Sequence, residues 1–218
     1  MKNTIIKVLS LGLLFSCLSV RSMETRLTDL PPEMHLEIVN SLTTGETVEE
    51  ATDAIRNLAH IKNKKFYDLI NHGPIITELI NKIATQFTAD PYLVAAYLRT
   101  NSAFQWLTKK IKEAPDSSTN ALITAIQKAN SNAVSFLLKA GANPNLGVNN
   151  MWPIDLAWKS LSDAIATGNK PSQESLEIYK ALIKAGAKSG KSYGFTPHTD
   201  RLREEYGINL PPQFENPS

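Results

Sequence analysis

The residues that could carry chemistry in this chain of 218 amino acids are few, and their spacing argues against catalysis. The segment Gly186–Ser192 has the composition of a phosphate-binding loop. It has three residues between its glycines where that motif requires four, and it follows a helical pattern instead of a strand. We therefore expect no nucleotide site and no other cofactor.

The acids, histidines and serines show no catalytic or metal-binding arrangement. The four histidines lack the spacing of metal ligands. Two pairs of adjacent glutamates, at 49–50 and 204–205, would not face each other on a helix. No serine lies in a nucleophile elbow. The sequence therefore predicts neither an enzyme nor a metal site.

The charge balance argues against a nucleic-acid partner. The chain has 23 basic and 21 acidic residues, and three of the basic ones, Lys2, Lys7 and Arg21, lie in a first stretch of 22 residues without acids. Without that stretch the chain has no basic excess, whereas sequence-independent binding to phosphate requires a basic face. We expect Trp152 and Trp158 to pack within the fold and not to stack on bases.

The first 22 residues have the pattern of an export signal. A short cationic segment precedes the apolar run Val8–Val20, and Val20 and Ser22 are the small residues before a cleavage point at Met23. The run is too short to span a membrane, which takes ~20 apolar residues. We therefore expect an exported chain without a membrane span, located in the periplasm, at the cell surface or, after secretion, in a host cell.

The single cysteine leaves a second possibility for the leader. Leu14–Cys17 resembles a bacterial lipobox, in which the cysteine carries a lipid anchor. If cleavage instead follows Ser22, the mature chain has no thiol, and disulfides and cysteine catalysis are excluded.

Beyond the leader, apolar residues recur with the 3.6-residue period of a helix, and no run alternates as a strand does. The predicted fold class is therefore all-α. Thr47 and Glu50 have capping-box spacing, and Asp90 and Pro91 have the types that begin a helix. We expect Pro115–Ser118 to join two domains. The helices expected before this joint lie near 31–42, 47–59, 66–70, 75–87, 91–98 and 103–112.

An internal repeat follows the joint. Val134–Asn143 and Tyr179–Lys188 align without a gap, and each reads as a short amphipathic helix that ends in Gly-Ala. Glycine supplies the left-handed turn after a helix at no steric cost. A repeat of this kind predicts stacked units of similar structure.

These repeats resemble the ankyrin family. Gly141–Asn145 matches the Gly-Ala-Asp-x-Asn end of an ankyrin unit, and its Thr-Pro-Leu-His-x-Ala start is matched at Asn120–Ala125, at Trp152–Ala157 and in part at Thr196–His198. The second unit is longer than the family pattern, with a loop at Gly168–Ser172, and the third stops after one helix near 197–206. Since ~3 units are needed to bury a core, we expect the preceding helices to cap the stack.

The resemblance implies protein binding through the hairpin tips between units. It places these tips at Leu146–Met151 and Lys188–Phe195. Apolar groups there would otherwise face water. The residues expected to contact a partner are Val148, Asn149, Asn150, Met151, Lys191, Tyr193 and Phe195.

The segment Leu27–Asn71 resembles the F-box family. Leu27–Met34 looks like its Leu-Pro-x-Glu entry, Ile55–Phe66 looks like its second half, and the loop from Thr43 is longer than the family norm. The resemblance implies three helices that dock on the Skp adaptor of cullin ubiquitin ligases by helix-in-groove recognition. The residues it assigns to the adaptor are Leu30, Pro31, Ile38, Ile61 and Phe66.

Together these features predict a signal peptide (1–22), F-box-like helices (23–72), a helical linker or cap (73–117) and ankyrin repeats (118–218). The predicted function is a protein-binding scaffold, as a secreted effector that recruits a host ubiquitin ligase. One alternative is a structural ankyrin protein of the periplasm or surface, with the F-box-like helices in its core. Another is a hydrolase in 75–114, whose acids before Glu113 are Glu78 and Asp90.

Overall fold

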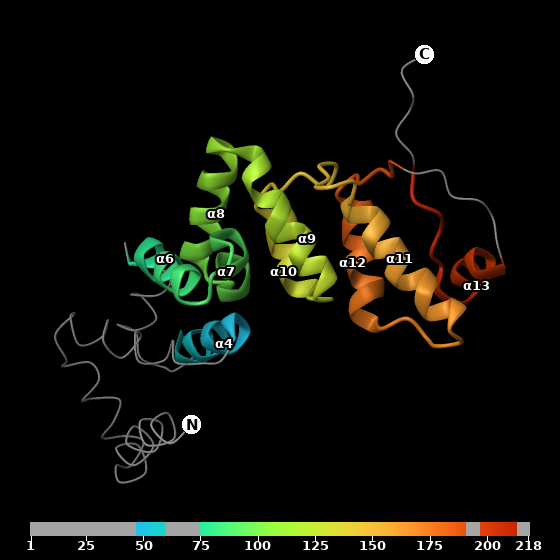
Figure 1. The fold of residues 1–218 in the computed structure, drawn as a ribbon, viewed down its shortest axis with the longest axis horizontal. Coiled ribbons are helices and arrows are strands. Elements are labelled where there is room, and N and C mark those ends of the chain that lie inside the picture. Colours follow the sequence, from blue (N-terminus) through green and yellow to red (C-terminus); the bar gives the residue numbers. More distant parts are fainter. Residues whose placement is uncertain (1–46, 60–74, 191–196, 213–218) are drawn as a thin grey trace, which may run out of the picture. The chain divides into compact units, whose positions relative to one another are not determined.

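The computed structural model describes residues 47–59, 75–190 and 197–212, and this part of the chain is all-α (Figure 1). Within it there is no strand, and one isolated bridge joins Val148 to Met151. The fold class predicted from the sequence is therefore confirmed for the described residues. The helices are α4 (Val48–Ala59), α6 (Ile76–Gln86), α7 (Pro91–Leu98), α8 (Asn101–Glu113), the 3-10 turn η1 (Pro115–Ser118), α9 (Thr119–Gln127), α10 (Ser131–Lys139), α11 (Pro153–Ala166), α12 (Gln173–Lys184) and α13 (Pro197–Tyr206).

The contacts divide the chain into two compact units. The first contains α4, α6 and the start of α8, and the second contains α7, the rest of α8 and everything from η1 onward. No helix in the described ranges is long and apolar enough to cross a membrane. The predicted signal peptide, the lipobox at Cys17 and most of the F-box-like segment lie outside the described residues.

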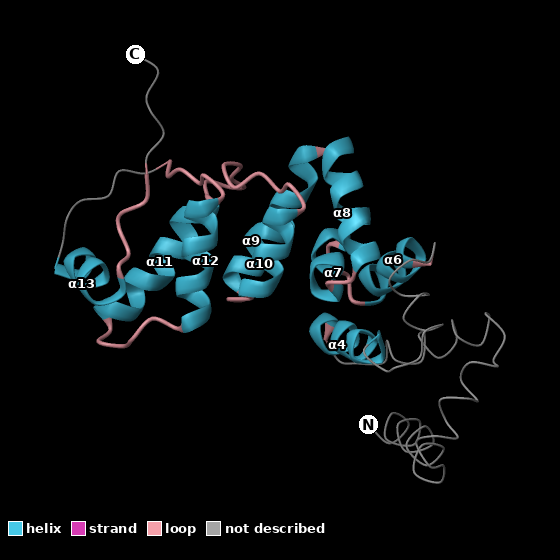
Figure 2. Cartoon of the chain, turned by 180° about the vertical axis from the view of Figure 1, so that it is seen from behind, coloured by secondary structure: helices cyan, strands magenta, loops and turns pink. Residues whose placement is uncertain are grey.

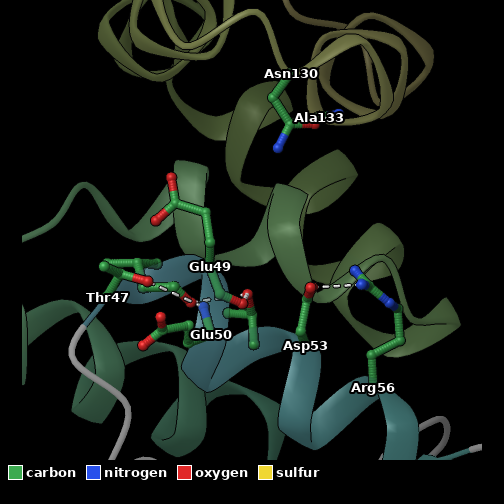
Figure 3. Close-up of polar contacts among 9 residues, drawn as sticks. Thr47, Glu49, Glu50, Asp53, Arg56, Asn130 and Ala133 are labelled. Atoms are coloured by element: carbon green, nitrogen blue, oxygen red, sulfur yellow. Dashed lines mark hydrogen bonds and ion pairs between the residues drawn. The ribbon is translucent and has the colours of Figure 1, made fainter.

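Helix α4 begins where the capping-box pattern predicts. The backbone N–H of Glu50 donates to Thr47 Oγ1 at 3.2 Å, and Arg56 forms an ion pair with Asp53 one turn further on (Figure 3). Ala51 and Ile55 are fully buried, as expected for the apolar face of this helix. In the same unit α4 packs against α6.

Helix α7 has the predicted bounds, because Asp90 and Pro91 cap its N-terminus. Asp90 accepts a hydrogen bond from the backbone N–H of Tyr92 at 2.8 Å, and Pro91 occupies the first turn. Proline suits this position because the first N–H groups of a helix have no internal partner. The helix stops at Arg99, which has a left-handed φ of 52°.

Helix α8 begins two residues before the predicted start at Ala103. The hydroxyl of Thr100 accepts a hydrogen bond from the backbone N–H of Ala103 at 3.2 Å, which caps a helix starting at Asn101. This bond gives a partner to a first-turn N–H group that has none within the helix. The apolar period alone, without this cap, predicts the later start at Ala103.

The second unit contains two helix pairs that stack side by side (Figure 2). Helix α9 pairs with α10 and α11 pairs with α12, while α9 contacts α11 and α10 contacts α12. Helix α13 packs on α11, and α7 packs on α9 and α10. The core between these helices is made of fully buried aliphatic side chains: Leu122, Leu137, Ile154, Leu161, Ile178 and Leu182.

The segment Pro115–Ser118, expected as a domain joint, forms the 3-10 turn η1 and packs on α7 and α9. It lies inside the second compact unit, which begins before it. The expected loop at Gly168–Ser172 does separate α11 from α12, and α13 has the predicted bounds. The helix predicted near 197–206 is thus present, and no second helix follows it within the described residues.

Candidate binding surface at the hairpin tip

The segment Leu146–Met151, here called the tip, contains a two-residue hairpin. Val148 N–H donates to Met151 O at 3.1 Å, and Met151 N–H donates to Val148 O at 2.9 Å. Asn149 and Asn150 between them have positive φ angles of 51° and 60°. Positive φ at both central residues is the geometry of a type I′ turn, which asparagine tolerates better than most residues. The turn therefore explains the residue types, and it leaves both amide side chains exposed.

The ring of Trp152 packs against the backbone of the tip and of the loop after α12. A methyl group placed on Gly147 would lie 3.1 Å from the Trp152 ring, and one on Gly190 would lie 2.6 Å from its Nε1. The ring therefore packs against the backbone of both loops, and a side chain at Gly190 would force the ring or the loop to shift. Trp158 is 3% exposed and packs on the ring of Tyr179 with centroids 5.8 Å apart. Both tryptophans pack within the fold, as predicted from the sequence.

The amide of Asn145 joins the loop before the tip to the loop after α12. Its Nδ2 donates to Gly186 O at 3.1 Å, and its Oδ1 accepts from the backbone N–H of Lys188 at 2.7 Å. Asn143 Oδ1 accepts from Asn145 N–H at 2.9 Å and holds Asn145 in place. The two loops are thus fixed to each other by one side chain.

A buried carboxylate joins helix α11 to the same loop after α12. Asp155, in the first turn of α11, is 5% exposed, and its Oδ1 accepts from Ser189 Oγ at 2.5 Å. Its other oxygen has no partner among the described residues. The position at a helix N-terminus stabilises a negative charge. The sequence alone does not identify Asn145, Asp155 or Ser189, because their partners lie 34 to 43 residues away.

The amides of the segment that has the composition of a phosphate-binding loop are already used by the fold. Ala187 N–H donates to Leu182 O at 3.0 Å, Lys188 N–H to Asn145 Oδ1 at 2.7 Å, and Ser189 N–H to Pro212 O at 2.5 Å. A phosphate-binding loop needs such N–H groups free to face the ligand. This geometry argues against a phosphate site at these three residues.

The tip also contacts the neighbouring helix pair. Gln127, at the end of α9, donates from Nε2 to Met151 Sδ at 3.8 Å. Val148 and Met151 are partly buried, whereas Asn149 and Asn150 are exposed. Of the predicted contact residues, these four lie together in one hairpin turn. The remaining three, Lys191, Tyr193 and Phe195, lie outside the described residues.

All five predicted adaptor residues, Leu30, Pro31, Ile38, Ile61 and Phe66, also lie outside the described residues. The two acids weighed for a hydrolase are placed: Glu78 is exposed on α6, and Asp90 caps α7. Burial raises the pKa of Asp90, opposed by its backbone hydrogen bonds from Tyr92 and Leu93. Structural capping accounts for that environment. No cluster of acids, histidines or cysteines that could hold a metal ion occurs in the described part of the chain.

Comparison with known proteins gives no relative for this fold: no family model, no curated protein and no solved structure matches the chain.

Proposed function

We propose that the chain is a protein-binding scaffold in which residues 118–218 form a short ankyrin-type stack and the tip contacts a partner protein. The observation that carries this proposal is the attachment of the tip to the neighbouring loop. Asn145 and Trp152 connect it to the next loop, and a type I′ turn presents Asn149 and Asn150 to solvent.

A tip held in this way is suited to binding because little conformational entropy is lost when a partner docks. Each exposed asparagine amide can both donate and accept hydrogen bonds. The apolar side chains of Val148 and Met151 beside them supply the partly buried contact that binding surfaces need at their centre. The surface therefore combines specificity and apolar area in a few residues.

The proposal extends to the origin of the protein. The export-signal pattern and the F-box-like pattern favour a secreted effector that brings a captured host protein to a cullin ubiquitin ligase. This part rests on the sequence alone. A pull-down from eukaryotic lysate with the chain from Met23 to Ser218 tests it, with a folded Leu30→Ala, Pro31→Ala, Ile38→Ala variant as the comparison. Retention of the Skp adaptor by the parent only is the expected result, and its absence from both would leave an exported scaffold.

The tip is tested by a substitution that keeps the turn. Asn149→Gly with Asn150→Gly retains the positive φ angles and removes both amides. We expect this variant to lose a lysate protein that the parent captures and that quantitative mass spectrometry identifies. Asn169→Gly, in the loop at the other end of α11, removes an exposed amide in the same way and should leave that capture unchanged. Identical captures by all three chains would contradict the proposal.

A further inference from the structure

The outer side of α12 has a groove that the fold leaves open. It has a volume of about 290 Å³ and lies between α12 and the segment Gly207–Pro212 that follows α13. Lys180, Ile183 and Lys184 line it from the helix, and Ile208 and Leu210 line it from the segment. Tyr179 donates from its hydroxyl to Asn209 O at 2.6 Å, which holds the segment against the helix.

The internal repeat shows why this groove is open. Leu138 of α10 and Ile183 of α12 are equivalent positions in the aligned copies. Leu138 is partly buried in the stack, where α12 packs on α10, whereas Ile183 is 38% exposed. Among the described residues Ile183 is the one large apolar side chain that is exposed. The difference arises because no helix of the described chain packs on α12 as α12 packs on α10.

The charges at the groove define what would fit there. Lys180 and Lys184 are four residues apart on the same helix face as Ile183, and like charges at this spacing destabilise a helix. Neither lysine forms an ion pair with any acid that the structure describes. The groove thus has an apolar floor, and beside it lie two exposed cations that form no ion pair with the described acids.

We propose that this groove binds an amphipathic helix of a partner protein, with acidic residues beside its apolar face. The partner helix packs on α12 as α12 packs on α10. Its apolar residues cover Ile183 and Leu210, and its carboxylates pair with Lys180 and Lys184. This surface is independent of the tip, so a failure of one proposal leaves the other intact.

The test uses two synthetic helical peptides of about 15 residues, a length at which helicity is marginal until the peptide binds. Both carry leucines at i, i+3, i+4 and i+7, and one has glutamates beside them where the other has lysines. Labelled peptides are titrated with the full chain and binding is followed by fluorescence anisotropy. We expect the acidic peptide to bind roughly five- to tenfold more tightly, since charge complementarity selects the partner.

Charge reversal makes the test specific. Lys180→Glu with Lys184→Glu should reverse the preference, so that the basic peptide binds better. Lys139→Glu changes the residue equivalent to Lys184 in α10 and should leave the preference unchanged. Ile183→Ser, at an exposed position, should weaken both peptides in a chain whose circular dichroism is unaltered.

Four results would overturn the proposal. The first is equal or absent binding of the two peptides, and the second is a preference that Lys180→Glu with Lys184→Glu leaves unreversed. The third is binding that appears only when residues 213–218 are removed, which would make that segment the occupant. The fourth is a concentration-dependent dimer in sedimentation that Ile183→Ser abolishes, which would make a second copy the occupant.

Discussion

Helices α10 and α12 carry the two copies of the internal repeat, and their ends are built alike. Gly141 and Gly186 follow them with φ angles of 104° and 79°. The next residue in each copy donates its backbone N–H to the equivalent leucine carbonyl, Ala142 to Leu137 and Ala187 to Leu182, both at 3.0 Å. These are the bonds of a Schellman end. The same local sequence therefore produces the same local structure twice.

The surroundings of the two copies differ. Helix α10 is covered by α7, α9 and α12, whereas α12 is covered by α10 and α11 and otherwise by an extended segment. The N-cap residues differ in type but make the same bond. Asn130 Oδ1 accepts from Ala133 N–H at 3.0 Å (Figure 3), and Ser172 Oγ accepts from Ser175 N–H at 3.1 Å. The two copies share a local pattern, so the difference in the burial of their side chains comes from the helices and segments that pack beside them.

The largest expected effect is in the core of the two copies. Leu137→Ala and Leu182→Ala each remove a fully buried side chain, and such changes lower the free energy of unfolding by about 2 to 5 kcal/mol. We expect Leu137→Ala to cost more, because the groove beside α12 allows the structure around residue 182 to relax. Urea denaturation of both variants checks this order. A larger cost at residue 182 would mean that the extended segment packs as firmly as a helix.

The next effect is expected at Gly190, in the loop after the second copy. Gly190→Ala places a methyl group 2.6 Å from Trp152 Nε1, so the ring or the loop must shift. Overpacking of this kind costs about 1 to 3 kcal/mol. Thermal unfolding measures the cost, and a change in tryptophan emission reports the shift of the ring. Gly168→Ala has nothing within 4 Å and tests the cost of a left-handed glycine without a clash.

Asn145 connects the loops that follow the two copies, and its removal should separate them. Asn145→Ala deletes the bonds to Gly186 O and Lys188 N–H, at a cost of about 1 to 2 kcal/mol. Hydrogen exchange at the Lys188 amide should become faster. Asn145→Asp keeps an acceptor for that amide and should retain its protection. Unchanged exchange in the alanine variant would show that the loops hold together without this side chain.

A smaller effect distinguishes the two glycines that end the copies. Alanine in the left-handed region costs about 1 kcal/mol at either position. Added atoms at Gly186 meet nothing within 4 Å, whereas at Gly141 they reach Ile111 Cγ2 at 3.8 Å. The φ of 104° at Gly141 lies further than the 79° at Gly186 from the left-handed minimum near about 57°, so we expect Gly141→Ala to cost more than Gly186→Ala by a few tenths of a kcal/mol. Parallel denaturation curves of the two variants measure the difference.

The smallest effect lies outside both copies, at Asp90. Burial raises the pKa of this carboxyl, so the folded chain holds its proton more tightly than the unfolded chain. Its contribution to stability is therefore greatest below pH 3.8 and falls as the pH rises through the raised pKa. Asp90→Asn keeps the cap and removes this contribution. The difference in unfolding free energy between parent and variant should fall with rising pH, and a rise would contradict the sign.

The sequence by itself determined the elements whose causes lie within about four residues. The cap of α7 at Asp90 and Pro91, the Thr47 cap of α4 and the Gly-Ala ends of α10 and α12 could all be predicted, because side chain and amide are neighbours along the chain. Asn149 and Asn150 could be selected for the tip, though the reason found in the structure is their turn geometry.

The tertiary structure alone decided what joins these elements. Asn145 forms a hydrogen bond with Gly186, 41 residues away, and Asp155 forms one with Ser189, 34 residues away. Trp152 packs on Gly190. It also decided that Ile183 is exposed and that its equivalent Leu138 is partly buried. The reason is physical: a local pattern sets backbone conformation, whereas burial and pairing depend on which helix packs beside it.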